Sequence, residues 1–274
     1  MGPDPLAGNA VKAWTKTNKP VTTPGDVREL LSDDGWGMQQ KFDGHRVLVD
    51  LRRGEVWNRQ GVRYEQADKV LALNLPSADV VFDAEFISTQ KKLHVFDVMM
   101  VKDTNLESHT YIHRYSFLQG LFDRLSGDMR LVPMQTTTEA KTEAFSMIRK
   151  SGGEGVVFKS LHLVDSWTPR AIKHKFIKDV DCKVLATGLD GKSNMELGMF
   201  NGNEFISVGK CSSLTGDGPR VKVGDVVTVQ VLYSTKDGRL FHPTLPIIRT
   251  DKLPEECGTD QLEEVKTNKD YIYV

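Results

Sequence analysis

In the segment Lys41-Phe42-Asp43-Gly44-His45-Arg46, a lysine stands just before an Asp-Gly pair. A lysine amine attacks phosphorus only after it has lost its proton, and neighbouring cations or a metal ion favour that loss. Arg46 follows across the expected turn, where it could supply such a charge. Most lysines in such positions are nevertheless solvated surface residues. The segment therefore makes Lys41 a candidate nucleophile, and other motifs must support it.

Two acidic positions are candidates for binding a divalent metal. Glu85 closes Asp83-Ala84-Glu85, which follows the apolar run Val80-Val81-Phe82, and Glu154 comes directly after two glycines. One or two carboxylates, completed by water, suit Mg²⁺ bound to a phosphorylated substrate. Taken one at a time, each acid is more commonly a solvated loop carboxylate. Glu85 and Glu154 are therefore candidate ligands for Mg²⁺, and both interpretations stay open.

Three further lysines lie in predicted strands. Lys159 lies near the end of one strand, and Lys173 and Lys175 share one face of the next, because strand side chains repeat every two residues. A pair of lysines on one face can hold phosphate oxygens and neutralise charge in a transition state. Lysines also blunt exposed edge strands, and this second interpretation stays open.

The elements that would position these residues are short strands and amphipathic helices. Asp43-Gly44 and Arg53-Gly54 predict hairpin turns, and Ser151-Gly152-Gly153 predicts a helix end. We expect an α+β domain with an antiparallel sheet, because the strand–helix alternation of a parallel sheet is absent. The predicted strands are 37–42, 45–51, 55–59, 80–87, 93–99, 155–160 and 171–176, and the predicted helices are 26–34, 65–74, 111–125 and 138–150.

The pattern changes near residues 178–181. Short strand-like runs separated by glycine-rich turns follow, with little helical periodicity, at 182–187, 196–200, 204–208, 225–233 and 239–241. About five strands in ~90 residues is the size of a small β-barrel such as an OB-fold. The sequence therefore predicts two domains, residues 1–179 and an OB-fold domain at residues 180–274.

The composition is that of an ordinary globular protein. The chain has 274 residues with 39% hydrophobic and 27% charged residues, and no apolar stretch is long enough to span a membrane. Three widely spaced cysteines argue against a disulfide framework or a zinc site, so a cytoplasmic protein is expected. The net charge is −1, yet residues 150–252 carry 15 Lys and Arg against 11 Asp and Glu. A nucleic-acid surface would have to be a local patch.

Taken together, the motifs resemble the ordered motif series of the covalent nucleotidyltransferases, which include ATP-dependent DNA ligases, RNA ligases and mRNA capping enzymes. The segment 226–252 is similar to the end of a DNA-ligase OB domain. The resemblance covers about residues 37–252 and indicates a minimal ATP-dependent DNA ligase of the kind found in phages and some bacteria. The motifs are Lys41-x-Asp43-Gly44-x-Arg46, Asn58-Arg59-x-Gly61, Asp83-x-Glu85, Phe96-Asp97, Glu154-Gly155-Val156-Val157-x-Lys159, Lys173-x-Lys175 and Arg249-x-Asp251-Lys252.

The resemblance implies a role for each matching residue. Lys41 would attack the α-phosphorus of ATP, Phe96 would stack on adenine, and Gln39 would read the adenine edge. The implied catalytic residues are Lys41, Arg46, Lys173, Lys175, Arg249, Asp251 and Lys252. The implied nucleotide contacts are Gln39, Lys41, Arg46, Arg59, Glu85, Phe96, Lys159, Lys173 and Lys175. The implied nucleic-acid contacts are Arg59, Arg170 and Lys210.

Three positions depart from the usual family pattern. Phe42 stands where the family usually has Tyr, Asn58 where it has Ser, and Ala84 where it has Gly. None of these changes removes a reacting group. Ala84 would alter the local turn, because glycine tolerates positive φ and alanine does not.

The implied activity is the sealing of 5′-phosphate/3′-hydroxyl nicks in duplex DNA, with ATP consumed and Mg²⁺ or Mn²⁺ required. AMP would pass from Lys41 to the DNA 5′-phosphate, and the 3′-hydroxyl would then displace it. The implied protein is a monomer that binds nicked duplex DNA and no membrane, in the cytoplasm or, for a phage protein, the host cytoplasm. The alternatives are an RNA ligase, a GTP-dependent capping enzyme, and a non-catalytic OB-type nucleic-acid-binding protein.

Overall fold

The computed structural model describes residues 24–106, 108–122, 127–164, 171–189, 194–212 and 221–265. Two compact units are distinguished in the chain. The first takes in the described residues up to Ile148 together with Gly155–His174. The second takes in Arg149–Glu154 together with the described residues from Lys175 onward. No described helix has the length and apolarity needed to cross a membrane.

The first unit contains a six-stranded sheet in the order β3-β2-β4-β5-β6, with β7 beside β5. Its pairs are antiparallel except β5 with β7. The central strand β4 is buried on both faces, as its apolar run Val80-Val81-Phe82 predicts. The strands are β2 (His45–Asp50), β3 (Glu55–Asn58), β4 (Val80–Ile87), β5 (Lys92–Val101), β6 (Thr104–Asn105) and β7 (Met129–Leu131).

A second, three-stranded sheet runs in the order β1-β8-β9. It is made of β1 (Trp36–Lys41), β8 (Gly155–Ser160) and β9 (Ala171–Lys175). Strands β1 and β8 are antiparallel, and their register sets Lys41 opposite Gly155 and Gln39 opposite Val157. Residues more than 100 positions apart in the sequence thereby become neighbours.

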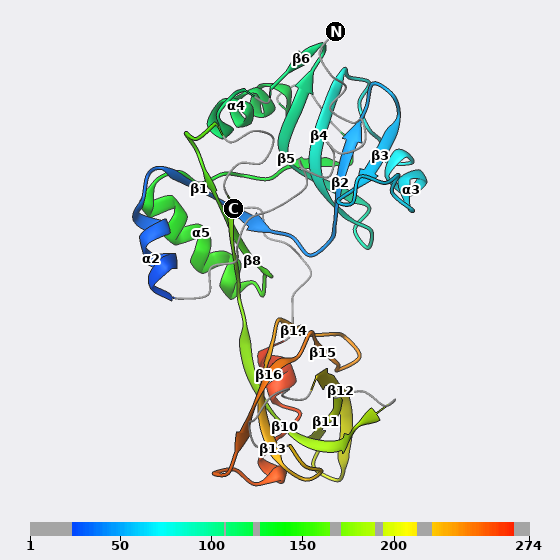
Figure 1. The fold of residues 1–274 in the computed structure, drawn as a ribbon, viewed down its shortest axis with the longest axis vertical. Coiled ribbons are helices and arrows are strands. Elements are labelled where there is room, and N and C mark those ends of the chain that lie inside the picture. Colours follow the sequence, from blue (N-terminus) through cyan, green and yellow to red (C-terminus); the bar gives the residue numbers. More distant parts are fainter. Residues whose placement is uncertain are drawn as a thin grey trace. The chain divides into compact units, whose positions relative to one another are not determined.

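Helices cover these sheets, as Figure 1 shows. They are α2 (Pro24–Ser32), α3 (Ala67–Leu71), α4 (Tyr111–Phe122) and α5 (Thr138–Lys150). Helix α4 packs on β5 and contributes Tyr111, Tyr115 and Leu118 to the main core, where they join Phe82 and Val95. Core packing of this kind fixes the strands on which the candidate residues stand.

A buried lysine holds the start of β1. Lys141 of α5 is fully buried, and its Nζ donates hydrogen bonds to the carbonyls of Leu30 (3.1 Å), Asp33 (2.7 Å) and Trp36 (3.1 Å). These carbonyls lie at the end of α2, in the turn after it and at the first residue of β1. The last carbonyls of a helix lack partners within the helix, and a cation suits them. Lys141 therefore fixes the path of the chain into the strand that ends at Lys41.

Replacing Lys141 by methionine is expected to lower the free energy of unfolding by about 2 kcal/mol, because one buried and two partly buried carbonyls lose their donor. Urea unfolding measures the change through the midpoint and the m-value. Lys150→Met is the matched control, since Lys150 is exposed at the end of the same helix. If Lys141→Met unfolded at the wild-type midpoint, the ammonium would not be supporting β1.

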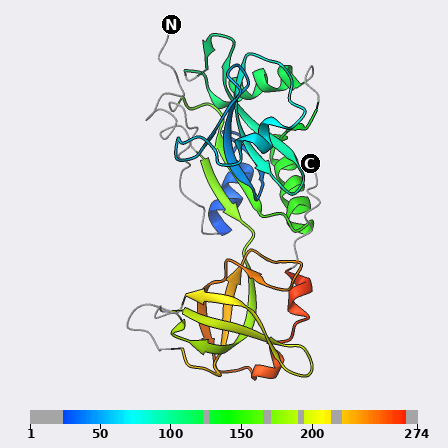
Figure 2. The same ribbon diagram turned by 90° about the vertical axis from the view of Figure 1, so that its right-hand side faces the viewer.

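The second unit is built on a five-stranded antiparallel sheet in the order β12-β11-β10-β13-β16, with a small pair β14-β15. Its core contains Val180, Cys182, Val184, Leu197 and Val229. Helix α6, red in Figure 2, lies beside the strands and follows the short helix η2. The bounds are β10 (Lys178–Thr187), β11 (Asn194–Phe200), β12 (Phe205–Ser212), β13 (Val226–Val231), β14 (Tyr233–Ser234), β15 (Leu240–Phe241), β16 (Thr244–Arg249), η2 (Pro254–Glu256) and α6 (Gln261–Glu264).

The α+β class predicted from the sequence is confirmed, but the closed barrel is not. Within the described residues no ladder joins the outer strands β12 and β16. The prediction that the first strand starts at 182 is wrong, because β10 begins at Lys178. Strand β16 was missed altogether. The predicted helix 138–150 is confirmed, and the predicted helix 65–74 is shorter, at Ala67–Leu71.

Candidate functional site

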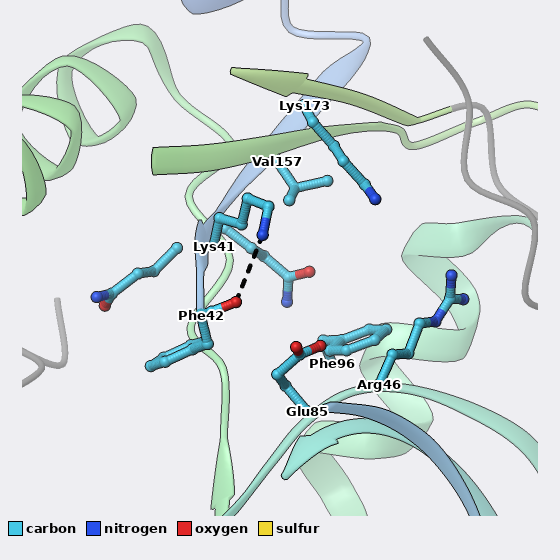
Figure 3. A pocket seen from close by; sticks show the side chains of 9 residues that line it. Lys41, Phe42, Arg46, Glu85, Phe96, Val157 and Lys173 are labelled. Carbon is cyan, nitrogen blue, oxygen red and sulfur yellow. Dashed lines mark hydrogen bonds between the residues drawn. The ribbon is translucent and has the colours of Figure 1, made fainter. Parts of the chain in front are cut away.

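A cavity in the first unit gathers many of the predicted residues. It encloses about 540 Å³ of space that opens to solvent. Strands of both sheets contribute, and Figure 3 shows the side chains of Lys173, Phe96 and Glu85 reaching toward one space from different strands. The lining residues are Gln39, Gln40, Lys41, Phe42, Arg46, Glu85, Phe96, Val157 and Lys173.

Two lysines enter this cavity from β1 and β9, the outer strands of the three-stranded sheet. Lys41 is the last residue of β1, and its Nζ lies 3.5 Å from the carbonyl oxygen of Phe42. Lys173 extends from β9 toward the same space (Figure 3). Burial, and after it the nearby charges of Lys41 and Arg46, lower the pKa of Lys173 to about 8. The cavity is thus a positively charged space suited to phosphate.

Carboxylates of β4 hold the turn between β1 and β2 and the arginine that follows it. Arg46 makes a two-pronged ion pair with Asp83, with Nε–Oδ1 at 2.9 Å and Nη2–Oδ2 at 2.5 Å. Glu85 accepts a hydrogen bond from the backbone N–H of Gly44 at 3.1 Å. A Cβ on Gly44 would lie 2.6 Å from the carbonyl oxygen of Phe86, so only glycine fits this close approach. The Asp43-Gly44 pair therefore lets Lys41, Arg46 and Glu85 meet.

Phe96 forms an aromatic wall of the cavity, with cations on it. The Arg46 guanidinium lies 5.6 Å from the Phe96 ring centre, and Lys159 Nζ lies 4.3 Å from it. Lys159 is buried behind the cavity and is not among its lining residues. Burial lowers the pKa of Lys159 to about 7, although Asp97 and Asp83 oppose that shift. Such distances favour cation–π attraction to the ring.

Gln39 lines the cavity with its amide already held from behind. Its Nε2 donates to the carbonyl oxygen of Val132 at 3.0 Å, and its Oε1 accepts from the Tyr111 hydroxyl at 2.8 Å. Lys159 Nζ in turn lies 3.0 Å from that hydroxyl. Sequence reasoning missed Tyr111, because an aromatic residue on an apolar helix face reads as core.

The two predicted metal carboxylates lie in different units. Glu85 lines the cavity, whereas Glu154 belongs to the second unit and makes an ion pair with Lys175 at 3.2 Å. Neither Glu154 nor Lys175 is among the lining residues. The described residues contain no cluster of three or more His, Cys, Asp or Glu suited to a metal ion. Glu85 alone would still fit Mg²⁺, since this ion is commonly held by one carboxylate with water and substrate phosphates.

The predicted C-terminal motif residues are linked to one another in the second unit. Arg249 pairs with Asp251, with Nη2–Oδ2 at 2.6 Å, and lies 3.6 Å from Asp181. Lys252 also pairs with Asp181, which bonds Thr228 as well. A hydrogen bond from Arg249 lowers the pKa of Asp251 to about 2. The motif is therefore a network of charges anchored on β10.

The predicted nucleic-acid contacts belong to different elements of the chain. Arg59 is exposed just after β3, and its charge contributes to lowering the pKa of Lys173, although burial is the larger cause. Lys210 is exposed on β12. Arg170 lies outside the described residues.

Comparison with known proteins places the chain in a family. Residues 42–179 match the family described as ATP dependent DNA ligase domain, a match that begins directly after Lys41. The multifunctional non-homologous end joining protein LigD of Mycolicibacterium smegmatis is 24% identical over 307 residues, which cover 85% of this chain. The chain spans 40% of the length of that relative.

Solved structures share the fold. A Lig E DNA ligase superposes with a TM-score of 0.62 at 17% identity, covering 85% of this chain and 99% of that one. The Pmar-Lig structure superposes with a TM-score of 0.59 at 18% identity, covering 86% of this chain and 68% of that one. The fold agrees with the sequence match, and this chain belongs to the ATP-dependent DNA ligase domain family.

Proposed function

We propose that this protein is an ATP-dependent DNA ligase that seals nicks in duplex DNA through a lysyl-AMP intermediate on Lys41. The convergence of Lys41, Lys173 and Arg46 in one cavity, beside Glu85 and Phe96, is the observation that carries this proposal. A nucleotide needs an aromatic wall for its base and cations for its phosphates. The cavity offers both, together with an amine.

In the first step the deprotonated Lys41 amine attacks the α-phosphorus of ATP. A nitrogen–phosphorus bond forms, and the bond from the α-phosphorus to the bridging oxygen breaks to release pyrophosphate. Lys173 and Arg46 neutralise the charge that develops on the phosphate oxygens. Glu85 would hold Mg²⁺, which supplies further charge neutralisation when bound. Phe96 stacks on the base.

In the later steps AMP moves to the 5′-phosphate of the nick and is displaced by the 3′-hydroxyl. We assign Arg249, Asp251, Lys252 and Lys175 to phosphate chemistry, and Glu154 to metal binding once Lys175 releases it. Arg59, Arg170 and Lys210 contact the duplex, whose phosphate-directed binding makes affinity fall with salt. The remaining parts of the proposal are a boundary at 179/180, an OB-type second domain, a monomeric state and a cytoplasmic location.

Incubation of the protein with α-labelled ATP or GTP and Mg²⁺, followed by a denaturing gel, tests the proposal. We expect a band with ATP, a label that maps to the peptide containing Lys41, and sealing of a nicked duplex by the labelled protein. Labelling with GTP alone would indicate a capping enzyme, and sealing of RNA in place of DNA an RNA ligase. If the folded protein took no label from either nucleotide, the enzymatic proposal would be wrong. A non-catalytic nucleic-acid-binding protein would then be the remaining alternative.

The rate constant kcat/KM for adenylylation is expected to decline above about pH 8, because the pKa of Lys173 is lowered to about 8. Above that pH Lys173 is neutral and no longer balances phosphate charge, and kcat/KM reports the free enzyme. In Lys173→Arg the decline should move to higher pH, since arginine keeps its proton. Lys236→Arg, at an exposed lysine, should leave the profile unchanged. If kcat/KM of Lys173→Arg declined at the same pH as that of the wild type, the titrating group would not be Lys173.

A further inference from the structure

The side chain of Tyr111 joins three parts of the first unit at one point. Its hydroxyl lies 2.8 Å from Gln39 Oε1, 2.5 Å from the carbonyl oxygen of Phe96 and 3.0 Å from Lys159 Nζ. Tyr111 itself is fully buried on α4 and does not line the cavity. It therefore contacts two cavity residues, Gln39 and Phe96, without being able to touch a ligand there.

The direction of these hydrogen bonds follows from the chemistry of the groups. Gln39 Oε1 and the Phe96 carbonyl oxygen both only accept, so the one proton of the Tyr111 hydroxyl is shared between them in a three-centre hydrogen bond. Lys159 has only donors when charged and keeps N–H donors when neutral, so it supplies the proton that the hydroxyl oxygen accepts. Tyr111 is thereby fixed as a donor toward the cavity side.

This donor fixes which end of the Gln39 amide is the oxygen. The Val132 carbonyl requires a donor and holds Nε2, while Tyr111 requires an acceptor and holds Oε1. A turn of the amide by 180° would break both contacts. Each amide atom still has one free position, one N–H and one oxygen lone pair. The amide thus presents an acceptor and a donor in a fixed order.

That order selects one purine. A glutamine amide pairs with adenine by accepting from the N6 amino group and donating to N7. Guanine carries the O6 acceptor at the corresponding place, so the amide oxygen would face another oxygen. On the basis of the proposed function, we propose that Tyr111, donating to Gln39 Oε1 and backed by Lys159, is a positioning residue that sets the preference for ATP over GTP.

Helix α4 offers a closely matched control. Tyr115 is also buried, one turn further along the helix, and its hydroxyl donates to the same Val132 carbonyl at 2.9 Å. No hydrogen bond joins it to Gln39 in the described part of the chain. Tyr115→Phe therefore removes a buried hydroxyl from the same helix. It leaves the hydrogen bond between Tyr111 and Gln39 Oε1 in place.

The test measures labelling of the full chain by α-labelled ATP and GTP as a function of nucleotide concentration. Tyr111→Phe is expected to raise the KM for ATP about fivefold with little change for GTP, the effect of one hydrogen bond. The ATP-to-GTP ratio of kcat/KM should then fall about fivefold, and Tyr115→Phe should leave it unchanged. Thermal unfolding of both variants separates this effect from a general loss of stability.

A double-mutant cycle shows whether Tyr111 acts through Gln39. In the Gln39→Ala background, Tyr111→Phe is expected to cause no further change in the nucleotide ratio. An unchanged ratio in folded Tyr111→Phe, or the same fivefold effect without Gln39, would overturn the inference. If Tyr111→Phe did not fold, Lys159→Met should lower the ratio in the same direction, and an unaltered ratio there would overturn it. Failure of the proposed function is distinct, because the wild-type protein would take no label from either nucleotide.

Discussion

Replacing Lys41 by alanine is expected to eliminate attachment of AMP to the protein, while part of its ability to seal a nick that already carries AMP persists. The amine is the attacking group in the first step alone. The last step joins a 3′-hydroxyl to an adenylylated 5′-phosphate, and it uses the cations of the cavity without a lysine nucleophile. The two activities should therefore separate in this variant.

Labelling with α-labelled ATP measures the first activity, and gel analysis of a synthetic pre-adenylylated nick measures the second. Lys41→Arg is the matched control for charge, because a guanidinium keeps its proton and cannot act as a nucleophile. It should also take no label. Lys69→Ala, at an exposed lysine of α3, should behave as wild type.

Lys173 is the rival nucleophile. It lines the same cavity, and burial lowers its pKa to about 8, so its amine is more readily deprotonated than that of an ordinary lysine. If Lys41→Ala still accepted AMP, the label should map to the peptide containing Lys173, and the assignment of Lys41 would be wrong. The order of the motifs favours Lys41, since the Asp-Gly turn after it brings Arg46 and Glu85 to its side.

The cavity residues could be predicted from the sequence, whereas their neighbours in space could not. Lys41, Arg46, Glu85, Phe96 and Lys173 were all identified by motif order, and all of them line the cavity. Motif order reflects chemistry, which constrains residue type. It contains no information on register, which is fixed by packing of whole strands.

The pairing of Glu154 with Lys175 illustrates this limit. Each residue belongs to a motif with an expected ligand, which is a metal ion for Glu154 and an ATP phosphate for Lys175. Their ion pair at 3.2 Å depends on how the chain returns after β9, with the Phe176 N–H bonded to the Glu154 carbonyl at 2.9 Å. Nothing in the spacing of the two residues indicates that return.

Two errors in the predicted strands have simple causes. The predicted strand starts at 182, after the change of pattern near residues 178–181, but Val180, Cys182 and Val184 are buried at every second position of β10. That alternation is typical of a strand with one face in the core. Strand β16 was not predicted, and it contains Pro246, a residue type that argues against a central strand. It lies at the edge of its sheet, where proline is tolerated.

Replacing Asp97 by asparagine is expected to lower the free energy of unfolding of the first unit by about 3–5 kcal/mol. Asp97 and Arg114 are almost fully buried and form a two-pronged pair, with both N–O distances at 3.0 Å. Asparagine leaves the Arg114 guanidinium charged in a site that offers little water. Denaturant unfolding measures the loss, and Asp237→Asn, in an exposed pair with Arg239, should cause no measurable change.

The Asp97→Asn substitution should also disturb the candidate site, because the Asp97–Arg114 pair joins α4 to β5 at the residue next to Phe96. Arg114 also lies 5.5 Å from the ring of Tyr111, so both the aromatic wall and the Gln39 contact depend on this anchor. Replacing both partners by leucine leaves no unpaired charge and should recover part of the stability. If Asp97→Asn were as stable as wild type, the pair would not be holding the helix to the sheet. If the double variant were no better than the single one, the loss would come from packing, and the buried charge would not be its cause.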